Sequence, residues 1–125
     1  MNWTVIGSIL MALAVAAGAF GAHGLRSRLD AYSLSVYEKA VFYHFIHAIG
    51  ILLIALLARA DAISPAGQGR AAGLLLVGIL IFSGSLYALS ISGVRILGAI
   101  TPIGGIAFIA GWLLLAYEAT RVQRP

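Results

Sequence analysis

The first 25 residues, MNWTVIGSILMALAVAAGAFGAHGL, decide what kind of protein this chain is. They contain no charged side chain, and the 23 residues from Trp3 to Leu25 suffice to cross a hydrocarbon core of about 30 Å at about 1.5 Å per residue. Arg26 and Arg28 follow directly and end the apolar segment. A cleaved signal peptide would have a basic start and a shorter apolar region, so we expect a permanent transmembrane helix over residues 3–25.

The composition of the remaining chain agrees with this interpretation. Hydrophobic residues make up 62% of the 125 residues and charged residues only 10%, whereas soluble domains are about 45–50% apolar. A soluble domain of this size could not bury that much apolar surface. The eight basic residues are scattered at the ends of apolar blocks, and the chain has no cysteine. These features exclude a soluble enzyme, a nucleic-acid-binding protein, disulfides and iron–sulfur clusters.

Three further apolar blocks predict helices over residues 36–58, 71–92 and 102–120. Ser35 and Glu38 fit a capping box, in which each side chain bonds a backbone N–H at the helix start. Thr101 at the N-cap with Pro102 at the first helical position is likewise favoured. Residues 59–70 then read as a hydrophilic turn, and residues 93–100 as an apolar loop at the membrane surface. The alternative for the last block is a longer helix from Ile96, kinked at the proline.

The fold class that follows is an all-α integral membrane protein, an antiparallel bundle of four transmembrane helices in one domain, residues 1–125. Both termini then lie on one side of a bacterial inner membrane. Basic residues are tied at four on each side: Arg59, Arg70, Arg121 and Arg124 against Arg26, Arg28, Lys39 and Arg95. Discounting Lys39, which lies inside a helix, favours cytoplasmic termini, although a tie also permits mixed insertion.

Small residues predict where the helices pack, because helices in lipid associate through close backbone approach. The first helix carries them on two sides: Ala14, Gly18, Gly21 and Ala22 on one, and Ala12, Ala16, Ala19 and His23 on the other. We therefore expect it to lie between two neighbours. The corresponding residues in the later helices are Gly84, Gly104, Ala107 and Gly111.

Polar side chains at membrane depth mark the candidate site, because each is costly in hydrocarbon and faces a partner or a cavity. His44 and His47 are three residues apart and predict contact with the same neighbouring helix. Tyr43 lies beside them, and His23 lies at a comparable height. The third helix offers a matching stripe of Ser83, Tyr87 and Ser90. Hydrogen bonds between helices are the preferred interpretation, with a haem or metal ligand set as the alternative.

Charged residues near helix ends need no chemistry to explain them. Glu38 is accounted for by the capping box, and Lys39 can reach the interface through its long side chain. Glu118 and Arg121 are predicted to form a solvated ion pair in the last turn.

Several short blocks give the chain a family resemblance. They are Gly18-Ala19-Phe20-Gly21-Ala22-His23-Gly24-Leu25, Ala40-Val41 with Tyr43, His47 and Ala48, Phe82-Ser83-Gly84-Ser85-Leu86-Tyr87, and Thr101-Pro102-Ile103-Gly104-Gly105 leading to Gly111-Trp112. In combination they resemble the small membrane proteins grouped as domain of unknown function 423, related to eukaryotic transmembrane protein 256. The resemblance implies a four-helix inner-membrane protein with no established activity or cofactor. It also implies no fixed histidine at position 44, and so favours His23, His47, Tyr43 and Tyr87.

We predict a non-enzymatic bundle with a structural or accessory role, which binds lipid, other membrane proteins or a second copy of itself. No catalytic residue, cofactor or metal is predicted. A small-solute transporter or channel is the first alternative, and it requires a continuous water-accessible cavity between the first three helices. A haem- or metal-binding redox protein is the second, and it requires His23, His44 and His47 to converge.

Overall fold

The computed structural model describes residues 1–122, and this range consists of helices joined by short turns. In chain order the elements are α1 (Trp3–Phe20) with the π-helical turn η1 (Gly21–Leu25), α2 (Ala31–Arg59), α3 (Pro65–Gly78) running through the π-helical turn η2 (Ile79–Ser83) into α4 (Gly84–Ser92), and the 3₁₀ segment η3 (Arg95–Ala99) leading into α5 (Thr101–Val122). They form four continuous rods, each long and apolar enough to cross a membrane. The predicted all-α membrane fold with four spans is confirmed.

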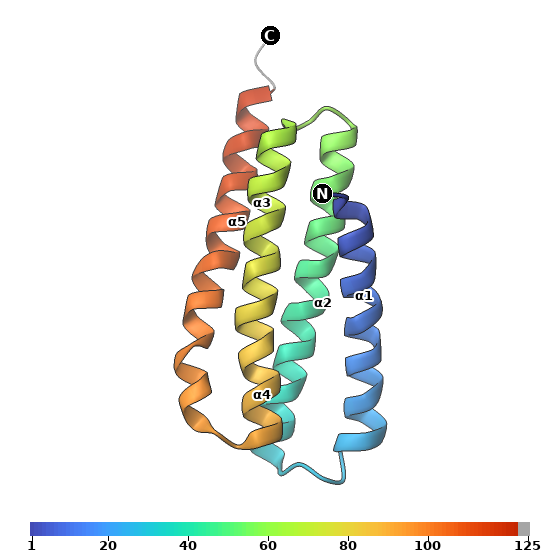
Figure 1. Ribbon diagram of the computed structural model, residues 1–125, viewed down its shortest axis with the longest axis vertical. Helices are drawn as coiled ribbons and strands as arrows, with labels where there is room; N and C mark the ends of the chain where they lie inside the picture. The colour runs from blue at the N-terminus through green and yellow to red at the C-terminus, as the bar shows by residue number, and fades with distance from the viewer. Residues whose placement is uncertain (123–125) are drawn as a thin grey trace.

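The rods run antiparallel, so the start of α1 and the end of α5 lie toward the same end of the bundle (Figure 1). We call this the terminal end, and we call the opposite end, formed by residues 26–30 and 93–100, the distal end. Helix α2 packs against α1 on one side and against the α3–α4 rod on the other, while α5 packs against α3 and η2. The order across the bundle is therefore α1, α2, α3–α4 and α5.

Helix α1 lies at the edge of the bundle, and the prediction that it sits between two neighbours is wrong. Ala14 is only 1% exposed on the side that meets α2. On the other side Ala12, Ala16 and Ala19 are all exposed. The α3–α4 rod and α5 lie beyond α2, so within residues 1–122 they leave this second face of α1 uncovered.

Helix α2 begins five residues before the predicted start, and the capping box is a wrong prediction. Its N-cap is Asp30, whose Oδ1 accepts the Ser33 backbone N–H at 2.7 Å. Ser35 and Glu38 consequently lie inside the helix. The earlier start gives the backbone carbonyls of residues 31–35 helical hydrogen bonds, which is an advantage close to the membrane.

Helix α3 also begins early, because the Ser64-Pro65 pair is a helix start and not part of a turn. Ser64 Oγ accepts the Gly67 backbone N–H at 2.9 Å, and proline occupies the first helical position. The predicted turn over residues 59–70 is therefore too long, since only residues 60–64 lie outside helices. This is the same pairing of a hydroxyl and a proline that was expected at Thr101.

At Thr101 itself the prediction of an N-cap is wrong. Thr101 is the first residue of α5, with Pro102 in its first turn, and its hydroxyl lies 2.6 Å from that of Ser85 on α4. The preceding residues 95–99 are 3₁₀-helical, which is closer to the alternative of a longer helix than to an apolar loop. Gly93 ends α4 in the left-handed region at φ 72°, the conformation that glycine adopts most easily at a helix end.

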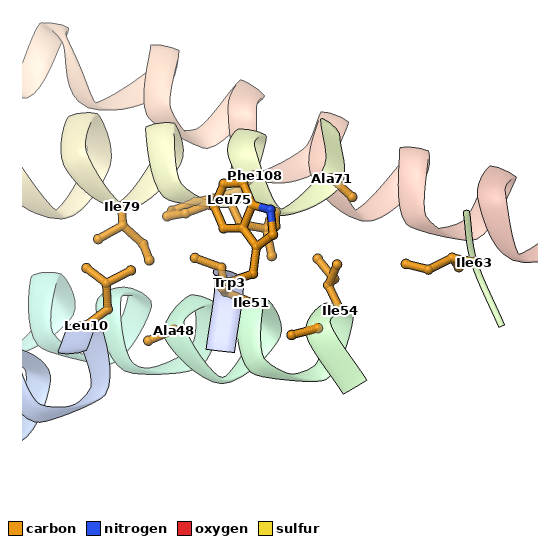
Figure 2. Close-up of a cluster of buried hydrophobic side chains, with 12 residues drawn as sticks. Trp3, Leu10, Ala48, Ile51, Ile54, Ile63, Ala71, Leu75, Ile79 and Phe108 are labelled. Atoms are coloured by element: carbon orange, nitrogen blue, oxygen red, sulfur yellow. The ribbon is translucent and has the colours of Figure 1, made fainter. Parts of the chain in front are cut away.

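The main core lies where α2, α3 and α5 meet (Figure 2). Leu75 of α3 and Ile51 and Ile54 of α2 are fully buried there, and Phe108 of α5 closes the cluster. Trp3 inserts its ring from the first turn of α1, and its edge comes within 3.9 Å of the position that a Cβ on Gly73 would occupy. The terminal half of the bundle is thus tied together by side chains from every rod.

Glycines allow the closest helix contacts. A Cβ on Gly104 would clash with the backbone of Phe82, which fixes the spacing of α5 and η2. A Cβ on Gly111 would lie 2.7 Å from Leu75, and one on Gly21 would lie 2.5 Å from the ring of Tyr37. These contacts bring the backbones together as expected in lipid.

Other small residues do not play the predicted packing role. A Cβ on Gly84 would meet nothing within 4 Å, and one on Gly18 would only reach ordinary contact with Val41 at 3.5 Å. Ala22 is exposed, whereas Ala107 is 9% exposed and packs inward. Spacing along a helix identifies small faces but does not say which of them meets a partner.

Candidate functional site

The polar centre of the bundle is a hydrogen bond between α2 and α4. His44 Nδ1 lies 2.9 Å from the hydroxyl of Tyr87, and the His44 side chain is only 5% exposed. Tyr87 also packs its ring against Tyr37, with centroids 5.3 Å apart. Tyr37 in turn donates its hydroxyl proton to the carbonyl of Ala17 on α1 at 2.5 Å. Three rods are linked through this chain of contacts.

The other ring nitrogen of His44 is unusual. Among the buried side-chain nitrogen and oxygen atoms of residues 1–122, His44 Nε2 alone has no hydrogen-bond partner. The backbone of Leu10 on α1 lies close enough to interact with the ring but outside hydrogen-bond geometry. If Tyr87 donates to Nδ1, then Nε2 carries a proton toward that backbone; if Nδ1 donates instead, Nε2 offers a lone pair. Nε2 therefore has one unused hydrogen-bonding capacity.

His47 has a different environment from His44, so the prediction that both face one neighbour is wrong. Its Nδ1 donates to the carbonyl of Tyr43, one turn earlier, at 2.7 Å. Its ring stacks on Phe108 of α5, with centroids 3.5 Å apart and planes 11° from parallel. His44 thus meets Tyr87 of α4, whereas His47 meets Phe108 of α5.

His23 does not join the other histidines. It lies in η1 at the exposed outer side of the bundle. Within residues 1–122, no three histidine, aspartate or glutamate side chains come together in a group that could hold a metal ion. The haem or metal alternative requires the three histidines to converge, and in the described residues they do not.

The three predicted hydroxyls of the α3–α4 rod, those of Ser83, Tyr87 and Ser90, bond three different partners. Ser83 donates to the carbonyl of Ala40 on α2 at 2.8 Å. The Tyr87 hydroxyl forms a hydrogen bond with His44. Ser90 donates to the Tyr87 carbonyl in its own helix at 2.8 Å. Only Tyr87 therefore bonds an imidazole of α2. Tyr43 packs its ring against Phe82, with centroids 4.4 Å apart.

A second polar cluster at the terminal end was missed by the sequence analysis. Glu118 of α5 is 1% exposed, and its carboxylate accepts from Ser64 Oγ at 3.1 Å and from Arg70 at 2.9 Å. The prediction of a solvated Glu118 and Arg121 pair is wrong, since Arg121 instead lies over the ring of Tyr117.

Helix starts explain why the carboxylate is buried there. Glu118 lies at the N-terminal turn of α3, where a negative charge is stabilised by free backbone N–H groups. Gly67 makes room for it, since a Cβ there would come within 2.5 Å of the carboxylate. The Ser64-Pro65 start and the glycine three residues after Ser64 were the available signals, but only the fold pairs them with α5.

Comparison with known proteins identifies relatives along nearly the whole chain. A family model described as "Protein of unknown function (DUF423)" matches residues 17–105. UPF0382 membrane protein SSP2132 of Staphylococcus saprophyticus is 48% identical over 118 residues, which cover 94% of this chain and 96% of the relative. UPF0382 membrane protein YwdK of Bacillus subtilis is 46% identical over 118 residues, which cover 94% of each chain. No solved structure matches.

Proposed function

The chain belongs to the DUF423 family of membrane proteins, and from this premise we propose that it is a non-catalytic accessory module that docks another transmembrane helix on the outer face of α1. We define this outer face by Ala12, Ala16 and Ala19. These alanines are spaced four and three residues apart, so they form one stripe on a helix. All three are exposed, although the opposite side of α1 is packed against α2.

The uncovered small-residue stripe is the observation that carries this proposal. Transmembrane helices without a partner gain nothing from small residues, because their attraction depends on close backbone approach and van der Waals contact. Larger apolar side chains flank the stripe, with Leu13 on one side and Val15 on the other being 54% and 60% exposed. A facing helix could therefore sit close to the alanines while lipid covers the flanks.

The use of the internal polar groups supports a structural rather than a catalytic role. His44, Ser83 and Glu118 each bond a group on a neighbouring rod. Hydrogen bonds of this kind hold helices together in the membrane. The bundle that results is a stiff platform for a docking face.

Site-specific photo-cross-linking in native membranes tests the proposal. A photoreactive amino acid at Ala16 should give one discrete adduct with a membrane protein, whereas the same probe at Leu13 should label mainly lipid. An adduct of twice the chain's mass identifies a second copy, and any other mass identifies a different partner. Equal and diffuse labelling from both positions would contradict the proposal.

We further propose that the protein lies in the bacterial inner membrane with both termini in the cytoplasm. The excess of basic residues on the terminal side supports this orientation once Lys39 is discounted. One of the counted residues, Arg124, lies outside the described residues. Fusion of a reporter that is active only in the cytoplasm to the C-terminus should give full activity, and a periplasmic reporter should be inactive. The reverse pattern would overturn the orientation.

A further inference from the structure

A groove at the distal end separates α2 from η3 and the start of α5. It has a volume of about 420 Å³ and is lined by ten residues: Tyr32, Ser35, Val36, Lys39, Phe82, Leu86, Leu89, Gly98, Thr101 and Pro102. This volume lies within the range of about 300–1,000 Å³ that is typical of small-molecule sites. The α4 side chains form its floor, and α2 and α5 form its walls.

The groove exists because α5 presents different side chains along its length. In the terminal half, Phe108 stacks on His47, and a Cβ on Gly50 would come within 2.9 Å of Trp112, so aromatic rings fill the space between α2 and α5. Toward the distal end, Gly98 and Thr101 are too small to do so. The hydroxyl contact between Thr101 and Ser85 holds α5 to α4, and Ser35 and Lys39 of α2 remain exposed.

Lys39 is the one charged side chain that lines the groove. It is exposed and, within residues 1–122, takes part in no ion pair. The neighbouring carboxylates face elsewhere. Glu38 lines a smaller pocket between α1 and α2, and Asp30 lies with Arg95 in a separate depression. The groove therefore combines apolar side chains with one lining cation, Lys39, and Arg95 lies over the ring of Tyr32 at its edge.

The position of Lys39 along α2 relates the groove to the bilayer. Helix α2 has 29 residues, about 43 Å at about 1.5 Å per residue, and exceeds a hydrocarbon core of about 30 Å by about 7 Å at each end when centred. Lys39 is its ninth residue, so its Cα lies about 5 Å inside the hydrocarbon boundary. A lysine side chain at this depth reaches back toward the headgroups.

We infer that this groove is a binding site for one anionic phospholipid. The phosphate lies at Lys39 with the hydroxyls of Tyr32 and Ser35 near it, and the first part of an acyl chain covers Val36, Leu86 and Leu89. An apolar groove open to the bilayer favours an acyl chain, and a basic residue between transmembrane helices favours an anionic headgroup. The groove lies on α2, α4 and α5, so this inference is independent of the docking face on α1.

Native mass spectrometry of the purified full chain tests this inference with phosphatidylglycerol as the probe and phosphatidylcholine and oleate as comparisons. Wild-type protein should retain one phosphatidylglycerol in preference to the other two. Lys39→Gln should weaken its retention about fivefold, the effect of one basic residue near the surface. The matched control Arg28→Gln removes an exposed charge at the same end but outside the groove, and should retain the lipid. Gly98→Leu fills the groove while keeping Lys39, and should also lose the lipid.

Each other outcome would overturn the inference. Equal retention of phosphatidylcholine would remove the role of the charge, and preferential retention of oleate would assign the groove to a fatty acid. Equal losses in Lys39→Gln and Arg28→Gln would indicate a general charge effect. Wild-type retention by Gly98→Leu would place the lipid elsewhere on the surface.

Discussion

From the hydrogen bond between His44 and Tyr87 we predict how the free energy of unfolding changes when one or both of its polar groups are removed. Tyr87→Phe removes the hydroxyl that lies 2.9 Å from Nδ1. Because Nε2 already has no partner, both nitrogens of the buried ring then lack one. We expect this variant to lose about 1–2 kcal/mol of unfolding free energy, the cost of leaving a buried polar group unsatisfied.

The double variant should be more stable than this single variant. His44→Leu alone leaves the tyrosine hydroxyl without its partner and should cost about 1 kcal/mol. His44→Leu with Tyr87→Phe removes both polar groups and should cost less than Tyr87→Phe alone. The coupling free energy should fall near the upper end of interhelical hydrogen bonds in membranes, which average about 0.6 and reach about 1.7 kcal/mol.

Denaturation with SDS in mixed micelles, followed by circular dichroism, measures these free energies. A control cycle pairs His44→Leu with Tyr117→Phe, since Tyr117 lies exposed on α5. That cycle should be additive within about 0.3–0.5 kcal/mol. If the effects of His44→Leu and Tyr87→Phe on the free energy of unfolding also add within about 0.3–0.5 kcal/mol, this bond does not link the two helices.

Further predictions concern helix packing, the terminal cluster and the cap of α2. Gly104→Leu should prevent stable folding because its side chain would meet the backbone of Phe82, whereas Gly84→Leu, where a Cβ meets nothing within 4 Å, should keep a thermal transition in detergent close to that of the wild type. Glu118→Ala should cost about 2–4 kcal/mol in SDS denaturation because it removes two hydrogen bonds to a buried carboxylate, and the exposed control Arg121→Ala should cost less than about 0.5 kcal/mol; similar losses in both variants would contradict the cluster. The backbone N–H of Ser33 lowers the pKa of the Asp30 carboxyl, so the cap stabilises α2 above the ordinary aspartate pKa and is lost as the pH falls through the lowered value. The protection of the Ser33 amide, measured as its exchange rate relative to that of an unstructured amide at the same pH, should therefore fall in acid, and an Asp30→Asn variant should show no such titration.

The local signals for helix starts were partly predictable. Ser64-Pro65 and Thr101-Pro102 both pair a hydroxyl with a proline, yet Ser64 caps α3 from outside the helix, whereas Thr101 is already the first residue of α5. The difference is the partner of the hydroxyl. Ser64 bonds the Gly67 N–H of its own helix, whereas Thr101 meets Ser85 on another. A capping motif states what a side chain can do locally, and tertiary contacts decide whether it does so.

The sequence by itself determined that this chain crosses a membrane four times and which polar residues lie at membrane depth, because the bilayer requires about 20 apolar residues per crossing and makes every charge costly. Only the tertiary structure decided which helix faces meet. It paired His44 with Tyr87 and Glu118 with Ser64, and left one alanine face of α1 and the groove beside Lys39 open. The physical reason is that a helix repeats its small and polar residues on several faces, and in lipid no hydrophobic difference selects among them; close packing with a particular neighbour does.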